Sequence, residues 1–150
     1  MKVRPIEAPD LDVWAAMRGR LWPDAAAADL VAEARAFVAG SADQILAAAF
    51  IAEDRAATPL GFVELAVRGF SDGCTSMPVP HVEGWYVEPT ARGNGVGRRL
   101  LDAAEGWARA HGFSELASDT GVHNEDSLRA HQACGFEEVD RLIKFRKALS

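Results

Sequence analysis

A glycine-rich segment near the middle of the chain constrains the fold more than any other feature. It runs Arg-Gly-Asn-Gly-Val-Gly-Arg-Arg from Arg92 to Arg99, and it joins an apolar, strand-like run, 81–87, to a strongly helical run, 100–111. A glycine loop that ends a strand and opens a helix presents free backbone N–H groups at the positive end of the helix dipole. Phosphate oxygens bind well there, so the sequence predicts a site for a phosphorylated cofactor.

Length and composition limit what can surround that loop. With 150 residues, 49% of them apolar, the chain is expected to form a single domain, 1–150, that is too small to hold two cofactor domains. The first ten residues lack a signal pattern, and no run approaches the roughly 20 apolar residues of a membrane span, so we expect a soluble, cytoplasmic protein. The net charge of −6 disfavours nucleic acid as a partner. Cys74 and Cys134 form no ligand spacing, and no metal site is expected.

Hydrophobic periodicity predicts helices and strands in the order β-α-α-β-β-β-α-β-α-β-β. Asp10, Asp24 and Asn124 are the expected N-caps of three helices. Expected strands lie at 2–5, 44–52, 60–70, 81–87, 115–118, 136–139 and 142–147. Expected helices follow Asp10 as far as Pro23 and lie at 25–38, 100–111 and 125–134.

The spacing of the glycines separates the possible loop chemistries. A dinucleotide fingerprint requires G-x-G-x-x-G, whereas Gly93, Gly95 and Gly97 give G-x-G-x-G with too little chain after them for a doubly wound sheet. A Walker loop requires Gly-Lys-Ser/Thr, but Arg98 follows Gly97. An R-x-x-G-x-G phosphate loop remains, and so does a ligand-free turn that uses glycine for backbone reasons alone.

The segment Arg92–Gly97 resembles the acetyl-CoA pyrophosphate motif of the GCN5-related N-acetyltransferase (GNAT) superfamily, whose fold has the element order predicted above. Further segments resemble the aminoglycoside 6'-N-acetyltransferases: 17–18, 21–23, 60–62, 82–87, 117–120, 135–138 and 145–147. The resemblance implies an α/β (α+β) fold with about four helices and a mixed, mostly antiparallel sheet of six to seven strands, splayed at its centre. It also implies acetyl transfer from acetyl-CoA to the 6'-amine of an aminoglycoside in a ternary complex, and hence antibiotic resistance.

The expected acetyl-CoA site combines this resemblance with the chemistry of the loop. Backbone amides hold the pyrophosphate, the open edge of strand 82–87 pairs with the pantetheine arm, and the resemblance assigns polarisation of the thioester carbonyl to the Val87 amide. Gly84 indicates a bulge or close backbone approach that separates this strand from 115–118. The candidate cofactor-binding residues are Tyr86, Val87, Arg92, Gly93, Asn94, Gly95, Val96, Gly97, Arg98 and Asn124.

Acidic residues near the expected splay are candidates for binding a polycationic acceptor. Glu83, Asp119 and Glu137 fall at strand positions or strand ends that converge there, whereas Glu138 should alternate to the opposite face. Trp22 is a candidate for stacking on a sugar ring, although a tryptophan beside a proline-terminated helix is as often a core anchor. Each acid taken alone is also typical of solvated surface.

Acetyl transfer requires a neutral amine, yet neighbouring carboxylates raise the pKa of its ammonium form. Glu83 or Asp119 is therefore the candidate base, acting directly or through water. In many superfamily members a tyrosine four residues before the Gly-Phe pair protonates the leaving thiolate, and His131 stands at that position here. His131 is the candidate acid, with a packing role as the alternative. His81 is assigned no function.

Two other activities remain open from the sequence. The same scaffold suits acetylation of a polyamine or a protein N-terminus, and it also suits a module that binds acyl-CoA without turnover. Because many relatives dimerise, a homodimer is expected.

Overall fold

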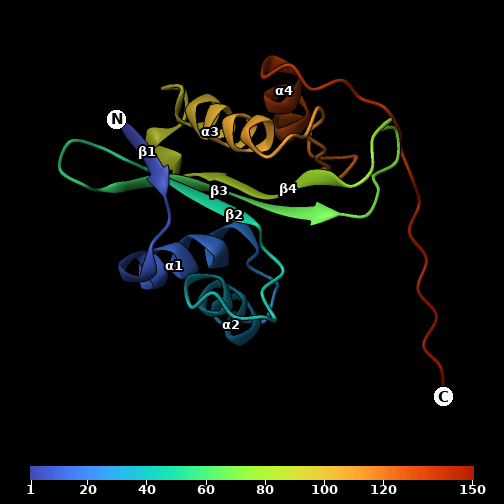
Figure 1. Ribbon diagram of the computed structural model, residues 1–150, viewed down its shortest axis with the longest axis horizontal. Helices are drawn as coiled ribbons and strands as arrows, with labels where there is room; N and C mark the ends of the chain where they lie inside the picture. The colour runs from blue at the N-terminus through green and yellow to red at the C-terminus, as the bar shows by residue number, and fades with distance from the viewer.

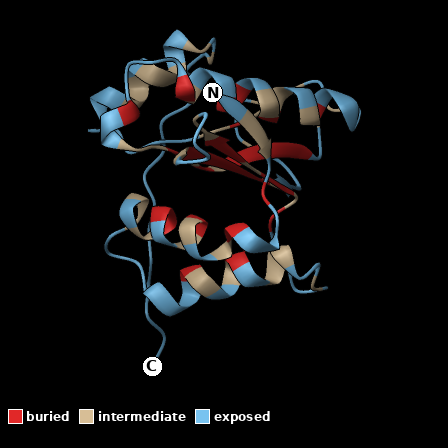
Figure 2. Cartoon of the chain, turned by 90° about the vertical axis from the view of Figure 1, so that its left-hand side faces the viewer, coloured by how far each residue is buried: buried red, intermediate tan, exposed pale blue.

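The computed structural model describes residues 1–150 and places a sheet between two pairs of helices (Figure 1). Helices α1 and α2 cover one face of the sheet, and α3 and α4 lie on the other (Figures 1 and 2). None of the helices is long and apolar enough to cross a membrane. The elements are β1 (Lys2–Pro5), α1 (Leu11–Leu21), α2 (Ala27–Val38), β2 (Ala48–Glu53), β3 (Pro59–Arg68), β4 (Val79–Val87), α3 (Val96–Ala110) and α4 (Glu125–Ala133), with short 3-10 turns at Ala8–Asp10 and Pro89–Ala91.

The sheet has four strands in the order β1-β2-β3-β4, and every neighbouring pair is antiparallel. Its register shifts once between β3 and β4, because Glu64 lies opposite Gly84 while Leu65 lies opposite Val82. Glu83 is therefore an extra residue on β4, which is the definition of a β-bulge. The distortion expected at Gly84 is confirmed.

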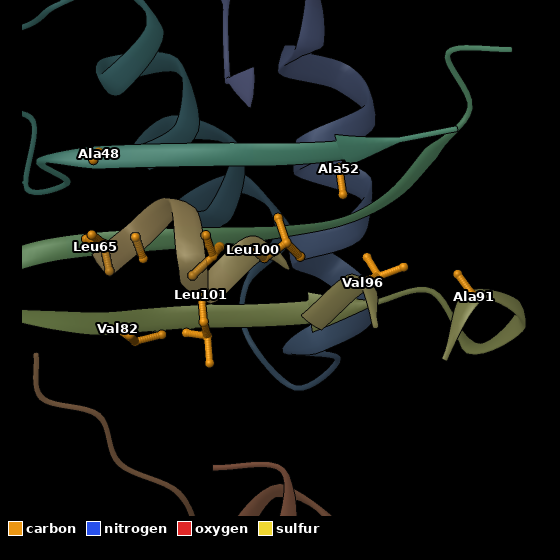
Figure 3. Close-up of a cluster of buried hydrophobic side chains, with 10 residues drawn as sticks. Ala48, Ala52, Leu65, Val82, Ala91, Val96, Leu100 and Leu101 are labelled. Carbon is orange, nitrogen blue, oxygen red and sulfur yellow. The ribbon is translucent and has the colours of Figure 1, made fainter. Parts of the chain in front are cut away.

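Two buried clusters hold the helices against the sheet. Figure 3 shows the cluster under α3, where Leu100 and Leu101 pack against β-strand side chains such as Leu65 and Val82. The cluster under α1 and α2 contains Trp14, Met17, Phe62 and Tyr86, among others. Full burial of one such apolar side chain contributes about 1.5–3 kcal/mol, so these faces account for most of the attachment of the helices.

Of the three expected helix N-caps, one is confirmed. Asn124 caps α4 as expected, because its side chain accepts a hydrogen bond from the Ser127 N–H at 3.1 Å. The cap expected at Asp24 is wrong, since α2 begins after Ala26 with no side-chain cap. Asp10 precedes α1, but its carboxylate is bonded to Arg4 and to the Glu7 N–H and caps no N–H of α1. A tertiary ion pair has replaced the expected local cap.

The predicted strand count is wrong, because the sheet has four strands and not six to seven. Segment 115–118 contributes one parallel bridge, His81 with Ala117, and segments 136–139 and 142–147 form no strand. Val139 lies against the loop at Gly73, and beyond it the C-terminal tail runs away from the body of the molecule (Figure 1). Its large apolar side chains are exposed: Val139, Leu142, Ile143, Phe145 and Leu149. Sequence alternation reports a preference for extended backbone, but a strand also requires a partner edge, and none within this chain reaches the tail.

Candidate active site

The glycine loop forms a concave row of backbone donors. Gly93 and Gly95 adopt left-handed φ angles of +79° and +78°, and Gly95 is the N-cap of α3. The N–H groups of residues 93–98 donate no hydrogen bond within the chain. No atom lies within 4 Å of a Cβ built on either left-handed glycine, so the loop is open to a ligand. Successive free N–H groups at a helix N-terminus bind phosphate oxygens, so the loop fits a pyrophosphate.

Two side-chain contacts, from Arg92 and Trp85, fix this loop to β4, and Asn94 braces the loop itself. The Arg92 guanidinium donates to the Val87 carbonyl at 2.9 Å, and the Asn94 amide donates to the Ala91 and Arg92 carbonyls at 3.3 Å. Trp85 donates its indole N–H to the Gly97 carbonyl at 3.1 Å. A Cβ on Gly97 would lie 3.1 Å from Trp85, so α3 approaches β4 closely there. The loop is therefore held rigidly beside the edge strand.

Strand β4 leaves one edge open beside the loop. The Glu88 N–H donates to Leu60 on β3 at 2.8 Å, and because N–H groups alternate along a strand, the Val87 N–H points to the opposite edge. That edge is paired only further back, where Val82 and Pro80 bond to Ala117 at 2.8 and 2.9 Å. The Val87 amide is therefore free to bind an extended ligand.

A cleft of about 620 Å³ opens on the α1 and α2 face of the same strand. Trp22 lies at its wall, where a Cβ on Gly84 would come within 2.8 Å of the indole Cη2. Its lining residues are Arg18, Trp22, Ala25, Leu30, Glu33, Ile45, Leu46, Glu64, Ala66, Val67 and Glu83. Because Arg18 pairs with Glu33 and Glu64, the carboxylate in this lining that it leaves for a polar cationic ligand is Glu83, beside Trp22.

Glu83 and Asp119 are brought close together, with a histidine between them. Arg68 holds the Glu83 carboxylate through two hydrogen bonds of 2.9 Å. His81 lies 3.5 Å from each carboxylate, through Nδ1 toward Glu83 and Nε2 toward Asp119. Burial and the nearby Arg68 cation lower the pKa of His81, while the two carboxylates partly oppose that shift. Sequence reasoning assigned His81 no role. Its position beside Glu83 depends on the bulge in β4, and the spacing of β4 residues around that bulge is the only signal that could have indicated it.

A buried ion pair at the base of the cleft was also missed. The Glu64 carboxylate accepts hydrogen bonds from Arg18 Nε and Nη2 at 3.0 and 2.9 Å and from the Trp14 indole at 3.2 Å. Burial raises the pKa of Glu64, and the hydrogen bonds from Arg18 oppose the shift. The Arg18 guanidinium also lies over the Trp22 ring, 5.1 Å from its centroid. Glu64 therefore anchors the arginine that supports the cleft wall.

His131 lies on α4, where both ring nitrogens have partners. Nδ1 is 2.7 Å from the Ser127 carbonyl, so it carries the proton, and Nε2 is 2.7 Å from the Ser118 hydroxyl. The ring packs edge-on against Trp85 and Phe136 at centroid distances of 5.2 Å. With both ring nitrogens engaged, His131 presents no free N–H toward β4, which favours the packing role.

The remaining predicted site residues lie apart from the acids. Glu137 is exposed in the tail, without the strand that was expected to hold it, and Glu138 pairs with Arg141. Tyr86 is buried, and its hydroxyl donates to Glu88 at 2.9 Å. Arg98 bonds to the Ala133 carbonyl at the end of α4.

Comparison with known proteins agrees with this geometry. The sequence model of the acetyltransferase (GNAT) family matches residues 13–136, so the chain belongs to the GNAT acetyltransferase family. Its mixed α/β architecture, with four helices and an antiparallel sheet, is that of the family.

Individual relatives share nearly the whole chain. The aminoglycoside N(6')-acetyltransferase type 1 of Klebsiella aerogenes is 44% identical over 98% of this chain and 96% of its own. The Stenotrophomonas maltophilia enzyme of the same name is 40% identical over 98% and 93%. AAC(6')-Iy in complex with the bisubstrate analogue CoA-S-monomethyl-acetylneamine has a TM-score of 0.89 and 35% identity, covering 99% of this chain and 98% of its own.

Proposed function

We propose that this protein transfers acetyl from acetyl-CoA to the 6'-amine of aminoglycosides. One observation carries the proposal: a cradle of free amides and an acid-lined cleft with a tryptophan wall flank the same strand, β4. Donor and acceptor bound at these two places would meet at the open edge. The names of the relatives, at 40–44% identity over nearly the full length, support this acceptor class.

The donor half of the site uses the main chain. The amides of residues 93–98 bind the pyrophosphate, and the pantetheine arm lies along β4 as an added strand. The Val87 N–H then donates to the thioester carbonyl and stabilises the negative charge that develops on its oxygen. Arg92 adds positive charge near the loop while it holds the Val87 carbonyl.

The acceptor half uses side chains. Glu83 and Asp119 bind ammonium groups, and Trp22 stacks on a sugar ring, with Glu137 as a further candidate contact from the tail. Asp119, whose side chain is 67% exposed, receives the proton that the ammonium loses before attack on the thioester. The leaving thiolate takes a proton from water or from His131, whose Nδ1–H must first release the Ser127 carbonyl.

A thiol-release assay tests the proposal. Kanamycin should release free CoA thiol, whereas an analogue with a 6'-hydroxyl in place of the amine should not. Activity on a polyamine or a peptide N-terminus alone would replace the proposed acceptor, and acetyl-CoA binding without turnover on any amine would indicate a non-catalytic module. Asp119→Asn should lower turnover more than acetyl-CoA affinity, with Asp140→Asn in the exposed tail as the matched control.

The assembly and setting are part of the same proposal. We propose that residues 1–150 act as one acetyltransferase domain in the cytoplasm, where acetyl-CoA is made, and that expression raises the resistance of a susceptible host to kanamycin. We also propose a homodimer, because the exposed apolar side chains of the tail, such as Ile143 and Phe145, require a partner surface. Light scattering should give twice the chain mass, and Ile143→Glu/Phe145→Glu should shift it to the monomer.

A further inference from the structure

His81 is a buried histidine placed between the two carboxylates proposed to bind the acceptor amine. Its side chain is 3% exposed, and its nitrogens lie 3.5 Å from Glu83 Oε1 and 3.5 Å from Asp119 Oδ2. Nδ1 is fully buried and has no hydrogen-bond partner. Buried polar atoms are normally satisfied, so an exception beside a ligand cleft indicates a role beyond packing. Contacts of this length in a ligand-free site typically shorten when substrate binds.

The geometry distinguishes the two nitrogens. A neutral imidazole has one N–H and one lone pair, so it can donate to only one of the two carboxylates. Glu83 is held in place by two hydrogen bonds from Arg68, whereas Asp119 is largely exposed. An imidazole that carries its proton on Nδ1, 3.5 Å from the fixed Glu83, leaves its Nε2 lone pair on the side of Asp119. A carboxylate that orients an imidazole in this way makes the opposite nitrogen a proton acceptor.

We propose that His81 is the proton acceptor behind Asp119, with Glu83 holding it in the Nδ1–H tautomer. This inference rests on the proposed function. The substrate ammonium gives one proton to Asp119, which passes it to His81 Nε2, and the neutral amine attacks the thioester carbon. The C–N bond forms and the C–S bond breaks. The second nitrogen proton passes to solvent, and the thiolate takes a proton from water or His131 and leaves as CoA-SH. His81 then returns its proton through Asp119 to solvent.

The surrounding charges suit this role. The groups that face His81 are Arg68 from β3, Glu83 from β4 itself and Asp119 from the segment after Ala117. Burial and the Arg68 cation lower the pKa of His81, so the free imidazole is neutral at neutral pH and ready to accept. This arrangement resolves the conflict between binding an ammonium and activating an amine, since the carboxylates attract the cation and a neutral base removes its proton.

His81→Gln tests the inference, because glutamine can bridge the two carboxylates but cannot take a proton. We expect kcat to fall about tenfold or more, within the usual range for a lost base, while acetyl-CoA affinity stays within about twofold. The wild-type kcat should fall at acid pH as His81 becomes protonated, and the variant should lack that limb. His111→Gln, an exposed histidine stacked on Trp107, is the control and should match wild type.

Two results would overturn the inference. One is a variant with wild-type kcat and an unchanged acid limb. The other is a variant whose acetyl-CoA affinity and thermal stability fall together with kcat, which would show a structural role.

A second readout is independent of the acceptor. Proton–nitrogen correlation spectra of ¹⁵N-labelled wild type, with the His81 signals assigned by their absence in His81→Gln, should show the Nδ1–H tautomer, and Glu83→Ala should abolish that preference. An Nε2–H tautomer would refute the arrangement. If no aminoglycoside releases thiol, the proposed function fails while this readout still decides the tautomer. If kanamycin is acetylated and both His81 tests fail, only the inference falls.

Discussion

Replacing Arg18 by methionine should reveal how strongly the buried ion pair supports the fold. Arg18 is 1% exposed and donates hydrogen bonds to Glu64, to the Leu30 carbonyl and to Glu33. Arg18→Met keeps much of the side-chain volume and removes the charge. The Glu64 carboxylate, also 1% exposed, is then left with the Trp14 indole as its one hydrogen-bond donor.

The size of the loss follows from the protonation of Glu64. A buried carboxylate without a cation takes up a proton, and at pH 7.5 a carboxyl with an ordinary pKa of about 4.3 needs about 4.4 kcal/mol to do so. That figure agrees with the roughly 3–5 kcal/mol lost when one partner of a buried pair is removed. In a domain of this size it corresponds to a fall in Tm of about 9–18 °C.

The same reasoning gives a pH dependence with a definite sign. In Arg18→Met the folded-state pKa of Glu64 lies above its unfolded value, so stability is retained below the unfolded value and lost as pH rises. The penalty should shrink from about 4 kcal/mol at pH 7.5 to about 1 kcal/mol at pH 5.0. Urea unfolding of variant and wild type at both pH values measures the difference.

Two further variants make the test specific. Arg18→Met/Glu64→Gln should recover most of the stability at pH 7.5, because no charge remains buried. Arg109→Met removes an exposed helix pair with Glu105 and should cost less than about 0.5 kcal/mol. A penalty for Arg18→Met below about 1 kcal/mol, or one equal at both pH values, would refute the reasoning.

Three other substitutions test the donor half of the site, the acceptor half, and one ion pair that stabilises the fold. Gly95→Val places a β-branched side chain at φ +78° and should weaken acetyl-CoA binding at least tenfold by calorimetry; unchanged affinity would remove the loop from the site. Gly84→Ala puts a Cβ 2.8 Å from Trp22 and should raise KM for kanamycin severalfold, whereas an equal rise for acetyl-CoA would contradict this assignment. The hydrogen bonds from Arg4 lower the pKa of Asp10 despite its partial burial. The urea midpoint of wild type should therefore exceed that of Asp10→Asn by its full amount above about pH 4, and the difference should vanish as pH falls further. A difference that stays constant with pH would exclude this linkage.

The sequence was most informative where local chemistry decides structure. The glycine loop between a strand and a helix follows from the spacing of a few neighbouring residues, and it is confirmed, with Gly93 and Gly95 left-handed at the start of α3. The C-terminal strands were predicted on the same kind of local pattern and are wrong. Extended backbone there lacks a partner edge, and the availability of an edge depends on strands far away along the chain.

Long-range pairs among polar residues could not be predicted in the same way. Arg18 and Glu64 lie 46 residues apart, and nothing near either residue in the sequence indicates that they meet in the core. The candidate site contains both kinds of feature, those set by local sequence and those set by long-range contacts. Residues 92–97 could be proposed as a phosphate loop from their spacing and resemblance, whereas the contacts of Glu83 and Asp119 with His81 depend on the sheet register.

The bulge on β4 sets which of its side chains face the candidate site. In regular alternation Val82, Gly84 and Tyr86 would share a face, and Tyr86 does pack under α1 and α2. Val82 instead packs under α3 opposite Leu65, because the extra residue, Glu83, shifts everything before it by one position. The shift puts Glu83 in the cleft and leaves His81 beside it, opposite Ala66. The one inserted residue therefore turns Val82 into the core under α3 and, on the other face, brings the Glu83 carboxylate beside the buried His81 imidazole.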